Sequence, residues 1–336
     1  MGEFSVRRGG MMSAGDTIEI GELRCNLAAT LACGQSFRWG SYTASGFQGA
    51  FPDEGGRWYG VVADAMIEIT PLGGGRLRIT ASRAKIGGRP LASFVRWLFR
   101  AEEADLAKEA ELEHFARHDP VFGEAYRTMA GLRLMRMAPF ECMMTFILSQ
   151  NNHVVRIART LEAIARRFGR KGVWRSKCFH AFPRFAALTI PSIPEESVFR
   201  ELGAGFRARY ITATLRTFVE RGTTPEASLA ALASLDTSDV AAALTTFPGI
   251  GPKVAHCILL FAFDRLEAVP VDTHILRMTR AAYGLDLASH EIRTFYLERF
   301  GALAGFVQHY FFAYSRYRHN RRFRELVDRE GAGIRS

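Results

Sequence analysis

Phe247-Pro248-Gly249-Ile250-Gly251-Pro252-Lys253 is the stretch from which the fold of this chain can be worked out. Two glycines one residue apart, flanked by prolines, predict a tight backbone turn. Residues 237–247 before the turn place apolar side chains at helical spacing, and residues 254–263 after it are apolar enough for a buried helix. The stretch therefore predicts two helices joined by a glycine hairpin.

The hairpin also suggests a binding function. A Gly-x-Gly turn that opens a helix presents backbone N–H groups to an anion, which for Gly249 and Gly251 would be a DNA phosphate. By itself the pattern is weak evidence, because most such turns only reverse the chain.

Two polar residues near the hairpin could carry chemistry. Lys253 begins the apolar helix, and Asp272 follows 19 residues later, at the expected start of a third helix. A lysine amine beside apolar surface can lose its proton and become a nucleophile. The alternatives are an exposed lysine at a helix start and an aspartate that caps a helix. Spacing alone leaves both interpretations open.

Composition indicates a globular protein with a basic surface. The chain has 336 residues, of which 48% are hydrophobic, so it can bury a core and form two or three subdomains. It contains no apolar run long enough to predict a transmembrane helix, and no signal peptide is visible. The net charge of +10 suits a polyanionic partner. Only five of the 44 basic residues are lysines, so the lysine at the hairpin is notable.

The cysteine pattern indicates a reducing compartment and no structural zinc. Five cysteines are scattered along the chain without any Cys-x-x-Cys pair. None follows Cys257, which argues against the four-cysteine iron–sulfur cluster that endonuclease III-type proteins usually carry after the catalytic domain.

The expected fold class is α+β: an antiparallel β-sheet domain over residues 17–103, followed by a mostly helical region over residues 104–325. Residues 1–16 are expected to be a disordered or tag-derived leader and residues 326–336 a tail. The arginine-rich end at 316–324 is either a phosphate contact or a solvated end, and the solvated end is the expectation. Short β-rich runs separated by glycine turns predict strands at 36–39, 57–62, 66–70 and 76–80. Apolar periodicity and caps predict further helices at 91–100, 106–117, 122–130, 139–150, 152–168, 196–202, 209–221, 225–232, 291–299 and 303–317.

The hairpin, together with Val269-Pro270-Val271-Asp272-Thr273-His274, resembles the helix-hairpin-helix glycosylase superfamily, and specifically its 8-oxoguanine DNA glycosylase/lyase branch. The resemblance extends over residues 17–325. It implies that Lys253 is the nucleophile and Asp272 the catalytic carboxylate. It also implies that the amides of Gly249 and Gly251, with His274, contact DNA phosphates.

A second motif is Cys33-Gly34-Gln35-Ser36-Phe37-Arg38-Trp39, which taken alone predicts a turn entering a strand. It resembles the N-terminal string of 8-oxoguanine glycosylases, in which a glycine carbonyl recognises the lesion; Gly34 is the matching residue. The chemistry is coherent, because N7 of guanine is an acceptor whereas N7 of 8-oxoguanine carries a hydrogen.

Two loops match residues that contact the opposite strand in this family. Asn151 matches an asparagine that fills the gap left by the extruded base, although taken alone it could cap a helix. Arg156 and Arg207 match arginines that recognise the estranged cytosine. Phe206 replaces the usual tyrosine wedge, and His153 replaces a third asparagine often found in relatives.

The last long helix supplies the remaining matches. Gln308 and Phe312 are four residues apart and share a helix face. The resemblance implies that Gln308 bonds the Watson–Crick edge of the flipped base, while Phe312 and Cys257 stack on its two faces. Taken alone, Cys257 is a buried cysteine. His256 stands where the family often has aspartate.

The resemblance implies a bifunctional enzyme that excises 8-oxoguanine opposite cytosine and cleaves the abasic site by β-elimination. The alternatives are a glycosylase for another damaged base and a non-catalytic DNA-binding protein. The expected partner is double-stranded DNA containing an oxidised guanine, with no membrane, and the protein is expected to be an intracellular, DNA-associated monomer. No cofactor and no iron–sulfur cluster are expected; a structural monovalent or divalent cation is allowed where the hairpin meets a phosphate.

Overall fold

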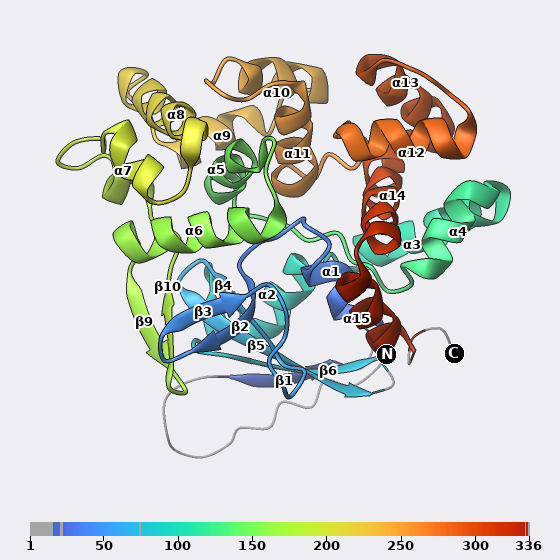
Figure 1. The fold of residues 1–336 in the computed structure, drawn as a ribbon, viewed down its shortest axis with the longest axis horizontal. Coiled ribbons are helices and arrows are strands. Elements are labelled where there is room, and N and C mark those ends of the chain that lie inside the picture. The colour runs from blue at the N-terminus through green and yellow to red at the C-terminus, as the bar shows by residue number, and fades with distance from the viewer. Residues whose placement is uncertain (1–15, 21–22, 74, 333, 335–336) are drawn as a thin grey trace.

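The computed structural model describes residues 16–20, 23–73, 75–332 and 334. The expected leader therefore lies outside the described residues, apart from Asp16. A β-sheet lies at one side of the molecule and helices cover the other (Figure 1). This arrangement confirms the predicted α+β class.

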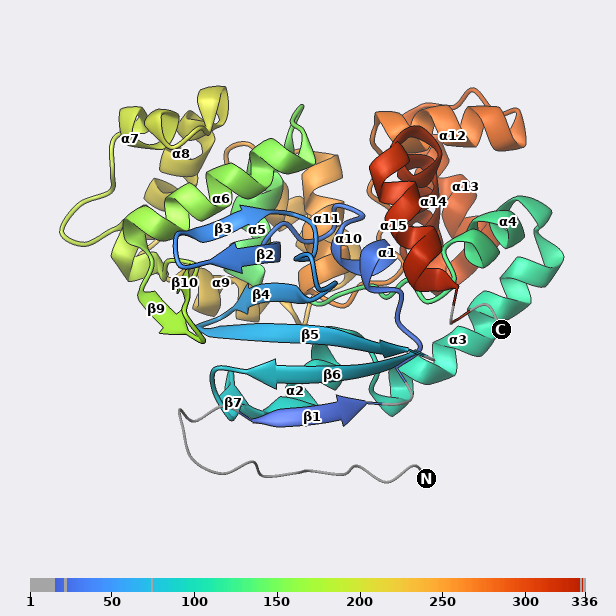
Figure 2. The same cartoon turned by 60° about the horizontal axis from the view of Figure 1, so that its bottom comes forward.

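The main sheet has six antiparallel strands in the order β1-β6-β5-β4-β2-β3 (Figure 2). Its interior strands β5 and β6 pair Ile69 with Ile79, and Gly73 and Gly75 lie where the chain turns between them. Small two-stranded pairs, β7–β8 and β9–β10, complete the β-structure of the described chain. The strands are β1 Thr17–Ile20, β2 Trp39–Thr43, β3 Gly46–Gly49, β4 Trp58–Val62, β5 Ala65–Gly73, β6 Arg76–Ala81, β7 Lys85–Ile86, β8 Arg89–Pro90, β9 Lys171–Trp174 and β10 Lys177–His180.

The predicted strand at residues 36–39 is wrong, because β2 begins only at Trp39. Side chains replace the strand pairing in this segment. Gln35 donates from Nε2 to the carbonyls of Thr30 and Arg133, at 2.8 Å each. Arg38 is buried and donates from Nε to Glu162 Oε1 at 2.9 Å. These contacts hold an irregular backbone against the helices.

The predicted helices are all present, and their ends lie within three residues of the predicted ones. Asp119 and Thr224 cap their helices, accepting from Phe122 N at 2.9 Å and Ala227 N at 3.2 Å. The helices are α1 Leu27–Leu31, α2 Leu91–Leu98, α3 Glu103–His118, α4 Pro120–Thr128, α5 Pro139–Ser149, α6 Val154–Phe168, α7 Glu196–Glu201, α8 Ala208–Glu220, α9 Pro225–Leu232, α10 Thr237–Thr245, α11 Pro252–Ala262, α12 Thr273–Tyr283, α13 Ser289–Phe300, α14 Ala304–His319 and α15 Arg321–Gly331.

The C-terminal segment differs from the expected tail at 326–336. Helix α15 packs beside α1, so the end of the chain returns to the N-terminal region (Figure 1). Glu330 accepts from Ala28 N at 2.6 Å and from Trp58 Nε1 at 3.1 Å. The apolar residues Phe323 and Val327, four apart, are buried on the inner face. The helical region therefore extends beyond 325, to residue 331.

The β9–β10 hairpin also joins segments that are distant in sequence. Trp174 and Phe179 pack in a small core with Tyr42, Tyr59 and Met66 of the main sheet. The expected division at residue 103 is thus incomplete, because part of the sheet domain's covering comes from residues 171–180.

Candidate active site

The glycine hairpin joins α10 to α11 as predicted. Gly249 has φ of +79°, and a Cβ there would lie 2.6 Å from Cβ and Cγ of Tyr210, so this position requires glycine. Gly251 precedes α11 with φ of −88° and has open space around it. Ile250, between them, is buried. The turn therefore exposes one glycine and packs the other against α8.

Lys253 lies in the first turn of α11 and is half-buried. Its Nζ is 3.5 Å from Ser149 Oγ and 5.4 Å from the centre of the Phe146 ring, both on α5. One turn further along α11, burial raises the pKa of the Cys257 thiol, and the charge of Lys253 opposes that rise. The amine thus lies between two apolar helices rather than in open solvent.

Asp272 is the N-cap of α12, so its expected capping role is present. Its Oδ1 accepts from the backbone N–H groups of His274 and Ile275, at 2.9 Å each. The other oxygen, Oδ2, takes no hydrogen bond from the described residues. One carboxylate oxygen therefore organises the helix while the second remains available.

A cavity of about 520 Å³ brings together seven of the residues singled out in the sequence. Its walls come from the loop before β2 and from α5, α6, α11, α12, α14 and α15. Lys253 and Asp272 line the same cavity, although α11 and α12 carry them separately. The seven residues are Gly34, Lys253, Cys257, Asp272, His274, Gln308 and Phe312.

Gly34 occupies a position that only glycine fits. Its φ is +101°, and a Cβ would lie 2.8 Å from Nη1 of Arg316 and 3.6 Å from Cε1 of Phe312. On α14, Gln308 is buried and Phe312 is half-buried. The conformation of the glycine loop therefore depends on side chains almost three hundred residues away.

The expected opposite-strand residues form a separate group outside this cavity. Asn151 is exposed with φ of +44°, Arg156 is exposed, and Phe206 is 45% exposed. Arg207 differs, because it is buried and donates from Nη2 to the carbonyl of Asn151 at 2.6 Å and also to the carbonyl of Gln150. It holds the asparagine loop in this structure.

Arg207 also lies close to other members of this group. Its guanidinium is 4.3 Å from the centre of the Phe206 ring. Burial, and then the charge of Arg156, lower the pKa of Arg207. Arg156, Phe206 and Arg207 are therefore neighbours, although α6 and the segment before α8 carry them.

Two cavity residues were not anticipated as site residues. His309 is buried beside Cys33, 3.7 Å from Nε2 to Sγ, and burial lowers its pKa to about 3. Arg316 lines the cavity instead of being solvated. Arg316 is four residues from Phe312 and eight from Gln308, and this helical spacing was the sequence signal that could have placed it in the cavity.

No helix in the described part of the chain combines the length and apolarity needed to cross a membrane. Within the same residues, no group of three or more histidine, cysteine or acidic side chains is arranged to hold a metal ion.

Comparison with known proteins connects this geometry to a family. Residues 17–143 match the family described as 8-oxoguanine DNA glycosylase, N-terminal domain. N-glycosylase/DNA lyase OGG1 of Arabidopsis thaliana is 34% identical over 202 residues, which are 58% of this chain and 54% of that protein. A probable N-glycosylase/DNA lyase of Methanothermobacter thermautotrophicus is 33% identical over 204 residues, covering 55% of this chain and 64% of the relative. The chain thus spans between half and two thirds of the length of these curated relatives.

A solved structure extends the similarity to nearly the whole fold. It is the 8-oxoguanine glycosylase/lyase of Clostridium acetobutylicum, in complex with double-stranded DNA that contains cytosine opposite 8-oxoguanine. It superposes with a TM-score of 0.77 at 26% identity and covers 95% of this chain and 99% of that one. The matched N-terminal domain and the shared fold make the chain similar to 8-oxoguanine DNA glycosylases over nearly its whole length.

Proposed function

We propose that this chain is a bifunctional DNA glycosylase/lyase that excises 8-oxoguanine opposite cytosine from duplex DNA. The observation that carries the proposal is the shared cavity of Lys253, Asp272 and Gly34. A primary amine, a carboxylate and the backbone of a glycine loop thus line one space, which supports the proposal. The names of the relatives and of the superposed complex support the same activity.

The proposed reaction begins with a flipped nucleotide in the cavity. Nζ of Lys253, in its neutral form, attacks C1′ and the base departs. Oδ2 of Asp272 stabilises the positive charge that develops on the sugar. Opening of the sugar gives an imine with Lys253, and the imine permits β-elimination of the 3′ phosphate. The amine supplies the covalent chemistry, so the proposal requires no cofactor.

The proposed DNA contacts divide between two surfaces. The exposed Gly251 amide and His274 would bind phosphates beside the cavity, and a cation there is a further proposal. Asn151, Arg156 and Phe206 would occupy the gap and face the estranged cytosine. Arg207 would share that cytosine only if its donors left the loop carbonyls that they now bind.

Borohydride trapping on an 8-oxoguanine duplex tests the proposal. We expect wild-type protein to release the base and form a trapped adduct, and Lys253→Gln to bind the duplex but do neither. Lys171→Gln is the matched control, because Lys171 is exposed on β9. A Lys253→Gln protein that still traps would mean that another amine is the nucleophile.

A lesion panel separates the remaining alternatives. A protein that binds every duplex without releasing any base would be the non-catalytic DNA-binding module. Release of another damaged base in preference to 8-oxoguanine would identify the glycosylase of different specificity. Equal release opposite all four bases would contradict the role given to Arg156.

A further inference from the structure

Arg316 extends the row of cavity residues on α14. It follows Gln308 by eight positions and Phe312 by four, so the three side chains share one helix face. Its Nη1 donates to the carbonyl of Ala32 at 2.9 Å. The same nitrogen lies 2.8 Å from where a Cβ on Gly34 would be. The guanidinium therefore lies at the glycine end of the lesion cavity.

Arg316 has no anionic partner in the described part of the chain. Its hydrogen bond goes to a neutral carbonyl, and its guanidinium is 5.3 Å from the centre of the Phe323 ring. Burial lowers the pKa of Arg316, yet a guanidinium keeps its proton in proteins. A half-buried cation without a counter-charge favours a ligand that supplies negative charge. The cavity is thus arranged for a ligand that becomes anionic.

We propose that Arg316 stabilises the negative charge that develops on the departing base, a role that rests on the proposed glycosylase function. In the excision step the lone pair of Lys253 Nζ forms a bond to C1′ while the C1′–N9 bond breaks. The electron pair of the broken bond leaves with the base. The proton that Nζ then sheds neutralises the base at N9, so charge and atoms balance.

The position of Arg316 suits an 8-oxopurine in particular. If the carbonyl of Gly34 accepts the N7 hydrogen, O8 lies at the same end of the cavity, because C8 is bonded to N7. Negative charge left on N9 spreads through C8 to O8, where the guanidinium can stabilise it. Guanine has no O8, so Arg316 would accelerate loss of the oxidised base more than loss of the normal one.

Two substitutions at Arg316 separate its charge from its hydrogen bond. Arg316→Lys keeps the charge, whereas Arg316→Gln keeps a donor for the Ala32 carbonyl but removes the charge. Arg318→Gln is the matched control, since Arg318 is on the same helix but exposed. Each protein is assayed in single turnover for 8-oxoguanine release and, separately, for cleavage of a duplex with a pre-formed abasic site.

We expect Arg316→Gln to release the base about 10²-fold more slowly, which is typical of losing one charge-stabilising group. We expect Arg316→Lys to be clearly faster than Arg316→Gln. Both variants and Arg318→Gln should cleave the abasic duplex at the wild-type rate, because no base departs in that reaction.

Three results would overturn the inference about Arg316. They are wild-type base release by Arg316→Gln, equal rates for the glutamine and lysine variants, and a parallel loss of base release and abasic-site cleavage. The last result would mean that Arg316 only supports the fold. If wild-type protein releases no 8-oxoguanine, the proposed function itself fails, which is a different outcome from these three.

Discussion

Asp272 combines a structural contact with a proposed chemical one. Its Oδ1 accepts from two backbone N–H groups at the start of α12, while the same carboxylate lines the cavity with Lys253. The two interpretations that spacing left open are therefore compatible. Substitution can separate them, because asparagine keeps an oxygen that accepts hydrogen bonds but loses the charge.

We expect Asp272→Asn to slow base release by about 10²–10³-fold, because the positive charge on the sugar loses its counter-charge. Its unfolding free energy should stay near the wild-type value. Asp272→Ala should be slow as well and should also lose about 1 kcal/mol of stability with the cap. Single-turnover kinetics and urea unfolding on both variants check this; an Asp272→Asn protein with wild-type kinetics would reduce the residue to a cap.

His309 makes stability depend on acidity. Burial lowers its pKa from 6.5 to about 3. Between these pH values the unfolded chain therefore binds a proton at His309, whereas the folded protein does not. The contribution of neutral His309 to the free energy of unfolding is therefore fully present above about pH 6.5 and is lost as the pH falls toward 3.

Between pH 6 and 4 we expect His309 to remove up to about 1.4 kcal/mol of stability per pH unit, the value for one proton. His309→Phe should flatten this dependence, and His290→Gln, at an exposed site, should leave it unchanged. Urea unfolding across this pH range measures the slopes. Equal slopes for wild type and His309→Phe would contradict the assignment.

At the scale of elements, the two glycines of the hairpin lie in different structural environments. Gly249 adopts positive φ against Tyr210, whereas Gly251 has an ordinary φ and open space. The first glycine therefore matters for the fold, and the second can matter for a ligand without affecting the fold.

We expect Gly249→Ala to destabilise the protein by about 1–3 kcal/mol, through left-handed strain and contact with Tyr210. Gly251→Ala should change stability by less than about 0.5 kcal/mol. Thermal unfolding distinguishes the two. Any loss of DNA affinity in a stable Gly251→Ala protein would then report on the phosphate contact, and equal destabilisation by both changes would contradict this division.

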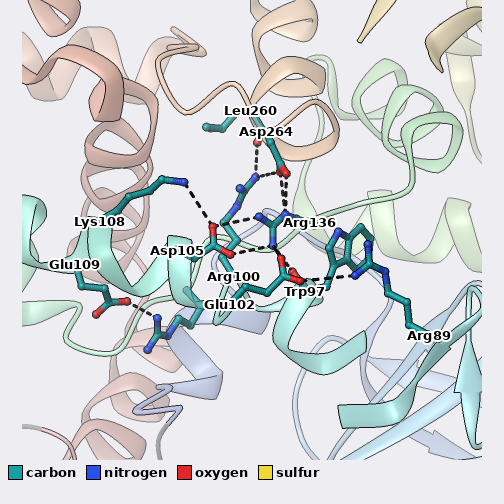
Figure 3. Close-up of polar contacts among 11 residues, drawn as sticks. Arg89, Trp97, Arg100, Glu102, Asp105, Lys108, Glu109, Arg136, Leu260 and Asp264 are labelled. Carbon is teal, nitrogen blue, oxygen red and sulfur yellow. Dashed lines mark hydrogen bonds and ion pairs between the residues drawn. The ribbon is translucent and has the colours of Figure 1, made fainter. Parts of the chain in front are cut away.

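At the scale of the whole molecule, a cluster of ion pairs joins the end of the β-sheet domain to the helical region (Figure 3). Arg136 lies at its centre and is buried. It binds both oxygens of Asp105 at 3.1 Å and Asp264 Oδ2 at 2.9 Å. Arg100 reaches the same Asp264 at 2.7 Å. Arg100 follows α2, Asp105 lies in the first turn of α3, Arg136 precedes α5 and Asp264 follows α11. The cluster therefore holds the C-terminal end of α11, the helix whose first turn carries Lys253.

We expect Arg136→Met to cost about 3–5 kcal/mol, because it leaves the buried Asp105 carboxylate without its main partner. Arg78→Met breaks the exposed pair with Glu19 and should cost at most about 1 kcal/mol. Chemical denaturation of the two variants provides the comparison. Similar values would mean that the cluster contributes no more than a surface pair.

Local signals were sufficient for predicting most elements and for singling out Lys253 and Asp272 as candidates. The hairpin, the cap at Asp272 and the periodic helices depend on residues within one or two turns, so their patterns are visible in the chain. Helix α15 also had such a signal, in the Asn320 cap and the spacing of Phe323 and Val327, but the density of arginines outweighed it. The strand predicted at 36–39 failed because Gln35 and Arg38 bond to distant groups.

The sequence by itself determined the fold class, the helix-hairpin-helix and the identities of Lys253 and Asp272 as candidates, because turn chemistry and helical spacing act locally. Only the tertiary structure decided that these residues share a cavity with Gly34, and that Arg207 holds the asparagine loop. It also showed that Arg316, which was expected at a solvated end, lines the cavity. Each of these outcomes depends on packing between segments more than fifty residues apart, and helical spacing within one segment does not specify which distant segment it packs against.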